Sequence, residues 1–361
     1  MGRVLLVGRG APERGGIPTY LHTLLASELE QRHDLSLLNQ SHGDVPAAGR
    51  LTGGNLGRLV RDAIHLWRAA AGQDVVHLHS ALAPAVTIAR AGLLCWVARR
   101  RGCRVILHAH GGLLLLWLTT PRRVRFVRAV LAPAHRVLAV SAALQGTLEQ
   151  AIGRRVDLVE NGVDTDEFAP GPPSKHSPPR VLYVGALTPR KGVLDLLEAS
   201  RLLTARSVPH ELHLVGGTPS EGGPAEEQVR AAVQGSGAHL LGDRQREQMP
   251  DVYRAADVLC LASWYEAMPL SVLEALASGL PVVATEVGDV ARVVRPGDTG
   301  ALVSARDPEG LAAALEPILL DADLRRRLGG NGRRTVMQHF ASSETARSID
   351  RIYVEEVGRG R

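Results

Sequence analysis

Aromatic residues are scarce, since phenylalanine, tyrosine and tryptophan together make up 3% of the 361 residues. Proteins that bind single-stranded nucleic acid commonly stack its bases on aromatic rings. The net charge of +5 and the pI of about 9.5 favour anionic partners, without choosing among phosphates, anionic lipids and nucleic acids. Because stacking residues are so few, we expect no nucleic acid among the partners.

Cysteine and long apolar runs are scarce as well. Cys95, Cys103 and Cys260 show no CxxC spacing, which argues against a disulfide framework or a zinc site and favours reduced thiols. No run approaches the roughly 18 apolar residues of a membrane span, and the segment Val4–Val7 is too short for the apolar core of a signal peptide. These absences predict a cytoplasmic protein, either soluble or peripheral on the inner face of the cell membrane.

Lysine is nearly absent, because Lys175 and Lys191 are the only lysines among 42 basic residues. A lysine kept in such an arginine-rich chain is a candidate for a role that arginine cannot fill. Lys191 follows Arg190 and stands just before a helix expected from about Val193. Two cations at a helix N-terminus would suit a diphosphate.

Short apolar runs alternate with helical segments along the whole chain. They are residues 4–7, 35–38, 75–79, 105–110, 137–141 and 156–159, and then residues 181–185, 211–216, 238–241, 258–262, 281–284 and 301–303. This alternation predicts parallel sheets with helices on both faces. The Pro/Gly/Ser-rich segment 171–179 predicts a linker. We therefore expect an α/β protein with two doubly wound, Rossmann-like domains facing a cleft, the first over residues 1–170.

A strand, a short loop and a helix are expected across residues 256–279, and they carry two glutamates. Pro269 suits the first helical position and Gly279 the C-terminal end. Glu266 in the loop and Glu274 on the helix would lie roughly 12 Å apart, wider than the about 5–9.5 Å of glycosidase carboxylate pairs. This spacing favours one long ligand held at two points, with an anion facing the amides of the helix N-terminus. The alternative is a pair of ordinary surface glutamates.

The first expected strand leads into a glycine-rich loop. The segment Gly8–Gly10 fits the start of a dinucleotide fingerprint, but Glu13 stands where the third glycine belongs, so a Rossmann-type NAD site is weakly supported. Gly15 and Gly16 precede a helix expected from about Pro18. This pair predicts a loop whose backbone approaches a phosphate or sugar. A plain turn is the alternative.

Four histidines and one DxD motif raise the question of a metal site. His77 and His79 lie on one face of an expected strand, as do His108 and His110. No carboxylate follows them at ligand spacing, and Asp164-Thr-Asp166 stands in a sequence typical of a turn, so we expect no metal. We interpret His77, His79 and His108 as satisfied core or strand-end histidines. His110 differs, because two glycines follow it and place it on a permissive loop at the end of its strand.

Residues 113–131 combine an apolar cluster with arginines. The arginines are Arg122, Arg123, Arg125 and Arg128. Such a basic amphipathic segment suits docking on an anionic membrane surface. A helix that packs its apolar side on the protein core and leaves its basic side in solvent is the alternative.

Taken together, these pieces resemble the retaining glycosyltransferases of family four, which have the two-domain GT-B fold. The matching segments are Gly15-Gly16, His110-Gly111, Glu160–Asp164, Val184-Gly185 with Arg190-Lys191-Gly192, Leu214–Gly217, Tyr253–Asp257, Glu266-x7-Glu274, Ala277–Ala284 and Gly297–Val303. The resemblance implies a nucleotide-sugar-binding domain over residues 180–338 and an acceptor-side domain before it. It also implies that residues 339–361 form helices that return to the first domain.

The resemblance further implies a metal-independent transfer of a sugar from a nucleotide-diphosphate sugar to an acceptor, with retention and without a cofactor. Glu266 would bind hydroxyls of the donor sugar, Glu274 would bind the ribose, and the cations would neutralise the leaving diphosphate. The implied catalytic residues are Glu266, Lys191, Arg190 and His110. The implied donor-binding residues are Gly15, Gly16, Asn161, Gly185, Ala267, Met268, Pro269, Leu270 and Glu274.

Two positions depart from the family pattern. Ala186 stands where an arginine usually follows the glycine at the strand end, and the family's Gly-Gly-x-x-Glu loop is Gly288-Asp-Val-Ala-Arg292. Two alternatives therefore stay open. One is a catalytically impaired homologue that binds sugar nucleotides, and the other is another GT-B enzyme, such as a nucleotide-sugar epimerase. The sequence does not specify the donor base or the acceptor, whether glycan, lipid-linked or small molecule.

Overall fold

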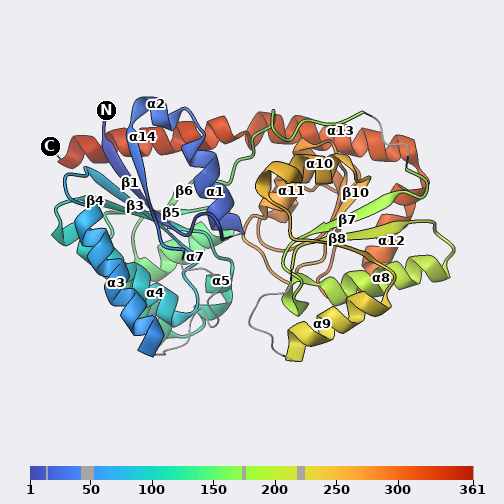
Figure 1. Ribbon diagram of the computed structural model, residues 1–361, viewed down its shortest axis with the longest axis horizontal. Helices are drawn as coiled ribbons and strands as arrows, with labels where there is room; N and C mark the ends of the chain where they lie inside the picture. The colour runs from blue at the N-terminus through green and yellow to red at the C-terminus, as the bar shows by residue number, and fades with distance from the viewer. Residues whose placement is uncertain (14, 42–52, 173–175, 218–223, 361) are drawn as a thin grey trace. The chain divides into compact units, whose positions relative to one another are not determined.

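The computed structural model describes residues 1–13, 15–41, 53–172, 176–217 and 224–360. The chain forms two compact units (Figure 1): the first comprises Met1–Gly162 and Ser342–Arg361, and the second Val163–Ala341. Each unit contains a six-stranded parallel sheet with flanking helices. The predicted architecture of two doubly wound parallel sheets is confirmed.

The first sheet has the strand order β2-β1-β3-β4-β5-β6. Its strands are β1 (Arg3–Gly8), β2 (Asp34–Asn39), β3 (Val75–Ser80), β4 (Arg104–Ala109), β5 (Arg136–Ala139) and β6 (Asp157–Leu158). The helices of this unit are α1 (Gly16–Leu25), α2 (Leu29–Arg32), α3 (Gly53–Ala69), α4 (Ala85–Arg100), α5 (Leu113–Trp117), α6 (Pro121–Leu131), α7 (Ala142–Ile152) and α14 (Ser342–Gly360).

The second sheet has the strand order β12-β11-β10-β7-β8-β9. Its strands are β7 (Arg180–Val184), β8 (Glu211–Val215), β9 (His239–Gly242), β10 (Val258–Leu261), β11 (Val282–Thr285) and β12 (Gly300–Val303). Its helices are α8 (Val193–Ala205), α9 (Pro224–Gly235), α10 (Met249–Arg254), α11 (Leu270–Ala277), α12 (Pro308–Leu320) and α13 (Ala322–His339), with short 3-10 turns η1 (Pro189–Lys191), η2 (Arg246–Gln248) and η3 (Val290–Arg292). Every apolar run named above contributes a strand.

The strands are apolar on both sides because helices cover both faces of each sheet. In β1, Leu5 and Val7 belong to a core cluster with residues of α4 and α7, whereas Val4 and Leu6 belong to another with residues of α1 and α14. Side chains of a strand point alternately to its two faces. A near-continuous apolar run is therefore what a strand in the middle of such a sheet requires.

The last helix, α14, packs against the first unit, as predicted. Ile349 and Tyr353 are fully buried in the cluster that also contains residues of β1 and α1. The Glu356 carboxylate is buried as well and lies 2.6 Å from Arg104 Nη2. An apolar face and a buried ion pair, whose residues are 252 positions apart in the sequence, thus attach this helix to the first sheet.

The boundaries of the units differ in detail from those expected from composition. The chain leaves the first unit after Gly162 and returns at Ser342, whereas we expected changes at 170–180 and 338. Val163 and Phe168 are buried in a core cluster of the second unit, so packing decides this boundary. Residues 173–175 of the expected linker lie outside the described residues.

Among the described residues, no helix is long and apolar enough to cross a membrane. Cys95, Cys103 and Cys260 are free and buried, as expected for reduced thiols. Burial raises the pKa of the Cys95 and Cys260 thiols to about 12, so these two side chains stay protonated at neutral pH.

His135 makes the first unit sensitive to acid. Its Nδ1 accepts a hydrogen bond from the Val105 N–H at 2.9 Å, and this bond requires an unprotonated nitrogen. Burial, together with the charges of Arg104 and Arg99, lowers the pKa of His135 to about 4. Because this value is below the usual one, the unfolded chain takes up the proton first as the pH falls. The stability that neutral His135 contributes is therefore lost between about pH 6.5 and pH 4.

Lowering the pH from 7.5 to 4.5 should reduce the unfolding free energy of the wild type. We expect this loss to be about 1–2 kcal/mol smaller in His135→Gln. This magnitude allows for solvent screening of a partly exposed group. Urea unfolding at the two pH values measures it. His22→Gln, which changes an exposed histidine of α1, is the control. Equal losses in His135→Gln and the wild type would contradict the assignment.

Candidate functional site

The carboxyl ends of β7, β10 and β11 lie next to one another, because these strands are neighbours in the second sheet. The direction of strand addition reverses between β10 and β7. Ligands of open α/β sheets bind outside the carboxyl ends of the strands at such a point. The loops that leave these ends contain Lys191, Glu266 and Gly288.

Lys191 and Glu266 form an ion pair in these loops. The Lys191 ammonium donates to Glu266 Oε1, which also accepts a hydrogen bond from the Ser263 hydroxyl at 2.8 Å. The Lys191 and Glu266 side chains are 20% and 13% exposed. The structure therefore brings together two of the predicted catalytic residues, which are 75 positions apart in the sequence.

Three hydrogen bonds hold the backbone of the Glu266 loop. The Trp264 N–H donates to Arg190 O at 2.9 Å, and the Asp289 N–H donates to Ala267 O at 2.9 Å. The Thr285 hydroxyl donates to the Ser263 carbonyl at 2.5 Å. The loop after β10 is thus tied to the loop after β7 on one side and to the end of β11 on the other.

Gly288 is pressed against the same backbone. Its φ is +54°, and a Cβ at this position would lie 2.3 Å from Glu266 O and 2.6 Å from Ala267 O. Only glycine fits this contact without displacing the loop. Asp289 and Arg292, which depart from the family pattern, pair with each other at 3.5 Å in η3.

Arg190 has a different environment from Lys191. Its guanidinium lies 5.8 Å from the centre of the Tyr265 ring, within cation–π range, and the residue is exposed. We expected both cations to face one diphosphate, whereas in the structure they have different partners. Gly185 directly follows β7, and the Ala186 carbonyl accepts a hydrogen bond from the Tyr183 hydroxyl at 2.8 Å.

Helix α11 begins at Leu270, one residue later than predicted. Pro269 is its N-cap, with φ −74° and ψ 124°, which is an extended conformation. Because proline has no N–H, position 269 offers no amide to a ligand at the start of α11. Ala267 and Met268 are buried, so the start of α11 is fixed by packing.

Glu274 is buried on α11 and has two partners that sequence reasoning did not assign to the site. Its Oε2 accepts a hydrogen bond from the Tyr253 hydroxyl at 2.7 Å, and its Oε1 lies 3.8 Å from Arg246 Nη1. Arg246 in turn donates to Glu167 at 2.7 Å. Burial raises the pKa of Glu274, while the Tyr253 hydrogen bond and the Arg246 charge act in the opposite direction. No spacing rule links these residues, so only the fold reveals the group.

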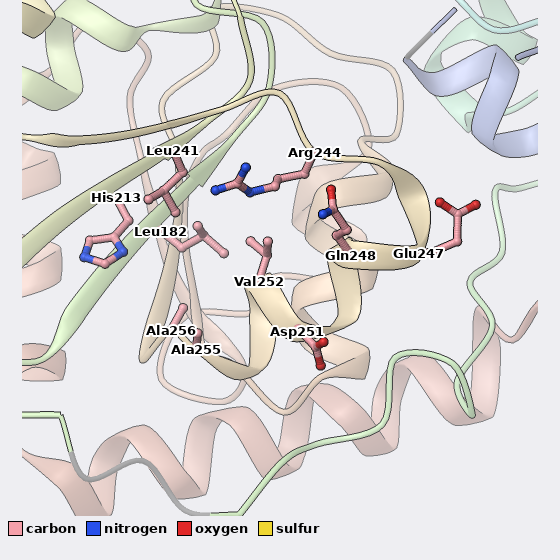
Figure 2. A pocket seen from close by; sticks show the side chains of 10 residues that line it. All are labelled: Leu182, His213, Leu241, Arg244, Glu247, Gln248, Asp251, Val252, Ala255 and Ala256. Atoms are coloured by element: carbon pink, nitrogen blue, oxygen red, sulfur yellow. The ribbon is translucent and has the colours of Figure 1, made fainter. Parts of the chain in front are cut away.

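A cavity of about 580 Å³ lies beside this group in the second unit. Its lining residues are Leu182, His213, Leu241, Arg244, Glu247, Gln248, Asp251, Val252, Ala255 and Ala256. Figure 2 shows the Arg244 guanidinium pointing toward Leu241. None of the predicted site residues lines the cavity, but Arg246, the partner of Glu274, directly precedes Glu247 in the chain.

In the first unit, the glycine loop leaves open space at the start of α1. Gly15 has a φ of +126° and caps the helix, which begins at Gly16, two residues before the predicted Pro18. A Cβ added at either glycine would meet no atom within 4 Å. The backbone at this helix N-terminus is therefore accessible to a ligand.

His110 and Asn161 are the other predicted residues of this unit. The His110 Nε2 lies 3.0 Å from His79 Nδ1, and Asn161 is buried after β6. Burial lowers the pKa of His110 to about 3, so its imidazole is neutral at pH 7. This side chain can exchange hydrogen bonds with a sugar hydroxyl but contributes no positive charge.

The prediction that His77, His79 and His108 are satisfied core histidines is wrong in one respect. They are buried, but His77 Nε2, His79 Nε2 and one ring nitrogen of His108 have no hydrogen-bond partner among the described residues. Period two in the sequence places these rings on one face but does not provide their partners. Asp164 does form the expected turn, since its Oδ1 accepts from the amides of Asp166 and Glu167, both at 3.0 Å.

The segment 113–131 forms α5 and α6, whose apolar side packs on the first unit. Leu114, Val127 and Leu131 are buried in its core. Arg123 lies 5.1 Å from the centre of the Trp117 ring. The apolar residues that a membrane helix would insert are thus largely used in packing, and exposed arginines remain on the surface.

Two family models match this chain, one in each half. The model described as Glycosyltransferase Family 4 matches residues 14–167, and that described as Glycosyl transferases group 1 matches residues 164–335. The solved structure of sucrose-phosphate synthase from Thermosynechococcus elongatus is 22% identical, with a TM-score of 0.79 over 98% of this chain and 99% of that one. That of Anabaena HepE in complex with UDP-glucose is 19% identical, with a TM-score of 0.77 over 98% of this chain and all of the other.

Two relatives of this chain bear the names of glycosyltransferases. D-inositol 3-phosphate glycosyltransferase from Frankia alni is 33% identical over 78% of this chain and 74% of its own length. The MMP alpha-(1->4)-mannosyltransferase of Mycolicibacterium hassiacum is 33% identical over 57% of this chain and 49% of its own. The chain thus spans about half to three quarters of the length of these relatives. With its two halves and its fold both matched, the chain belongs to the glycosyltransferases of family four, which have the GT-B fold.

Proposed function

We propose that the protein transfers a sugar from a nucleoside-diphosphate sugar to an acceptor, with retention at the anomeric carbon and without a metal at the diphosphate. The observation that carries this proposal is the Lys191–Glu266 pair at the strand-order reversal of the second sheet. It sets a cation and a sugar-binding carboxylate side by side. A donor of this class has a diphosphate and a sugar directly bonded to each other.

The chemistry follows from these charges. When the bond between the anomeric carbon and the diphosphate breaks, negative charge develops on the leaving oxygen, and the Lys191 ammonium stabilises it. Glu266 accepts hydrogen bonds from sugar hydroxyls and holds the ring in place, which reduces the entropic barrier. On this proposal, the acceptor oxygen bonds to the anomeric carbon on the face from which the diphosphate departs, the departing diphosphate oxygen takes the proton of the acceptor hydroxyl, and no protein nucleophile is needed.

The identity of donor and acceptor is open to direct measurement. HepE was solved with UDP-glucose, and the named relatives act on an inositol phosphate and transfer mannose. We therefore suggest UDP- and GDP-sugars as donors and phosphorylated polyols as the first acceptors to test. Free nucleoside diphosphate together with a glycosylated acceptor of retained configuration would support the proposal. Binding of donors with neither transfer nor slow hydrolysis would favour an impaired homologue, and a changed nucleotide sugar without transfer would favour an epimerase.

Association with anionic membranes stays a separate hypothesis. Since the apolar side of α5 and α6 packs on the core, any attraction would come mainly from the exposed Arg122, Arg125 and Arg128. Pelleting with anionic liposomes at low salt tests it, and a protein that stays in the supernatant would exclude it.

Gly288→Ala is expected to lower transfer activity at least about 10-fold, because the added Cβ must push the Glu266 carbonyl and its loop away. A non-glycine residue at positive φ also costs about 1–2 kcal/mol of stability. Gly297→Ala is the matched control, since Gly297 has φ +74° and a Cβ there meets no atom within 4 Å. Initial rates and melting temperatures of both variants separate loop displacement from backbone strain. Equal activities of the two variants would contradict the role given to Gly288.

A further inference from the structure

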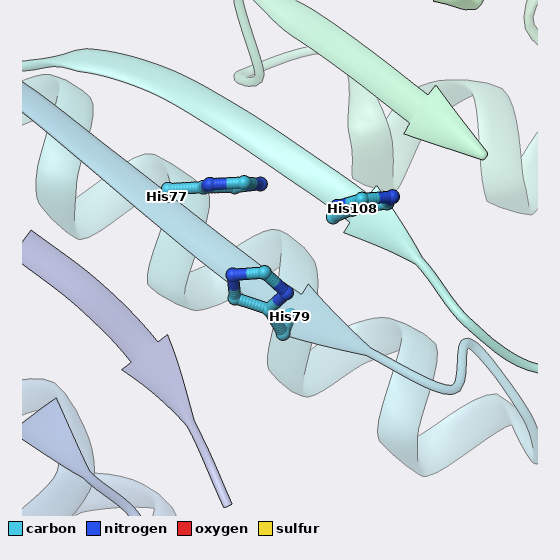
Figure 3. A group of neighbouring side chains, drawn as sticks. All are labelled: His77, His79 and His108. Carbon is cyan, nitrogen blue, oxygen red and sulfur yellow. The ribbon is translucent and has the colours of Figure 1, made fainter. Parts of the chain in front are cut away.

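Three buried imidazoles lie close together inside the first unit. Figure 3 shows His77 and His79 on β3 and His108 on the neighbouring β4. One ring nitrogen of each lies within 4.8 Å of the corresponding nitrogens of the other two. The residues are 0%, 7% and 0% exposed. The rings of His77 and His108 are nearly parallel, at 8°.

Hydrogen bonding divides the nitrogens into two groups. His77 Nε2, His79 Nε2 and one ring nitrogen of His108 lack a partner among the described residues, whereas the backbone of Val159 interacts with the His108 ring as well. The other nitrogens are held, because His77 Nδ1 lies 2.7 Å from the Tyr353 hydroxyl and His79 Nδ1 lies 3.0 Å from His110 Nε2. A buried polar atom without a partner is unfavourable and is rare in folded proteins.

This division is the one found in metal-binding histidines. A ligating imidazole uses one nitrogen for the metal and its other nitrogen for a hydrogen bond that fixes the ring. Metal binding also needs the neutral form of the ring. Burial lowers the pKa of all three histidines well below the usual value, so they are neutral at pH 7.

We propose that His77, His79 and His108 bind one divalent transition-metal ion, of the class represented by Zn²⁺. Imidazole nitrogen is a preferred ligand of zinc, nickel and copper, so the missing carboxylate that argued against a metal in the sequence is not required. Three imidazoles leave one position of a tetrahedral site for a further ligand. Tetrahedral bonds of about 2.1 Å set nitrogens roughly 3.4 Å apart, so binding would draw the three rings together.

The ion would be structural and separate from the diphosphate chemistry proposed for Lys191. It would join β3 to β4, and through the contact between His77 Nδ1 and the Tyr353 hydroxyl it would also support α14. Binding at His79 Nε2 leaves the proton on Nδ1, which then donates to His110 Nε2. His110 would keep its own Nδ1–H as a donor.

The test uses the full-length chain without a histidine tag, stripped with a chelator and dialysed against Zn²⁺. We expect one Zn²⁺ per chain by elemental analysis and a melting temperature several degrees higher than that of the stripped protein. His108→Leu replaces a fully buried imidazole by an apolar side chain, so the variant should still fold while both effects are abolished. Tyr353→Phe removes only the hydroxyl that orients His77 and should weaken Zn²⁺ binding about 10–100-fold.

His239→Gln is the matched control, because Glu211, His213 and His239 form the other group among the described residues that could hold an ion. This variant should bind Zn²⁺ like the wild type and show the same rise in melting temperature. Zn²⁺ binding lost in His239→Gln but kept in His108→Leu would overturn the proposal. Absence of bound Zn²⁺ in the wild type, or equal binding in wild type and His108→Leu, would overturn it as well.

Discussion

Lys191→Ala is expected to lower kcat by about 10²–10³-fold and to change the donor KM far less. The ammonium lies against Glu266 at the carboxyl ends of the central strands, where the leaving diphosphate is proposed to sit. Its contribution grows as charge develops on the diphosphate, so its loss affects the transition state more than the bound donor. Initial-rate kinetics over a range of donor concentrations separate kcat from KM.

Arg201→Ala is the control for this variant, since it removes a cation from the surface of α8, where Arg201 is 65% exposed and paired with Glu198. It should behave like the wild type. The binding of products gives a second readout. If Lys191 contacts the diphosphate, Lys191→Ala should weaken binding of a nucleoside diphosphate but not of the nucleoside. If Lys191 serves only as a counterion for Glu266, the affinities for the nucleoside diphosphate and for the nucleoside should change in parallel. Near-normal turnover of Lys191→Ala would exclude any catalytic role of Lys191.

The strands were predictable from the sequence for a simple reason. In a doubly wound unit both faces of a central strand are buried, so each strand appears as a short apolar run between turn residues. The boundaries between the units were less predictable. Val163 and Phe168 pack in the core of the second unit, although they precede the Pro/Gly/Ser-rich segment 171–179 in the sequence. Composition alone does not indicate to which core a residue belongs.

Of the candidate site, the sequence predicted which loops come together but not the contacts between their side chains. Strand order places the loops of Lys191 and Glu266 together, but the sequence does not state that these side chains pair or that Arg190 turns to Tyr265. Likewise, Arg246 precedes Glu274 by 28 residues, on a turn with no regular spacing to α11. Hydrogen-bond partners of this kind depend on tertiary packing, which local patterns do not encode.

The departures at Ala186 and Arg292 bear on how the diphosphate is neutralised. With alanine at position 186, the positive charge that follows β7 is supplied by Arg190 and Lys191 in η1. Arg190 is exposed near the Tyr265 ring, whereas Lys191 lies against Glu266, so Lys191 is the better placed of the two. Arg292 is held near Asp289, on the β11 side of the Glu266 loop. Both departures leave the Lys191–Glu266 pair intact, which favours an active enzyme over an impaired homologue.

Glu274→Gln is expected to weaken donor binding about 10–100-fold, with kcat at saturating donor changed little. Hydrogen bonds from hydroxyls to a charged acceptor contribute about 1.5–3 kcal/mol, and each 1.4 kcal/mol corresponds to about a factor of ten. The substitution keeps the shape of the side chain and an acceptor for the Tyr253 hydroxyl. It removes the charge that faces Arg246, so the effect reports on the carboxylate rather than on packing.

Titration calorimetry with the nucleoside diphosphate and with the nucleotide sugar measures this effect. Tyr253→Phe, which removes only the hydroxyl that orients Glu274, should weaken binding less, by a few-fold. Glu198→Gln, an exposed glutamate on α8, should change nothing. If Glu274 holds the ribose, its substitution should weaken the binding of a ribonucleoside diphosphate and leave the binding of the 2′-deoxy form nearly unchanged. Equal weakening of the two would assign Glu274 to the packing of α11 instead.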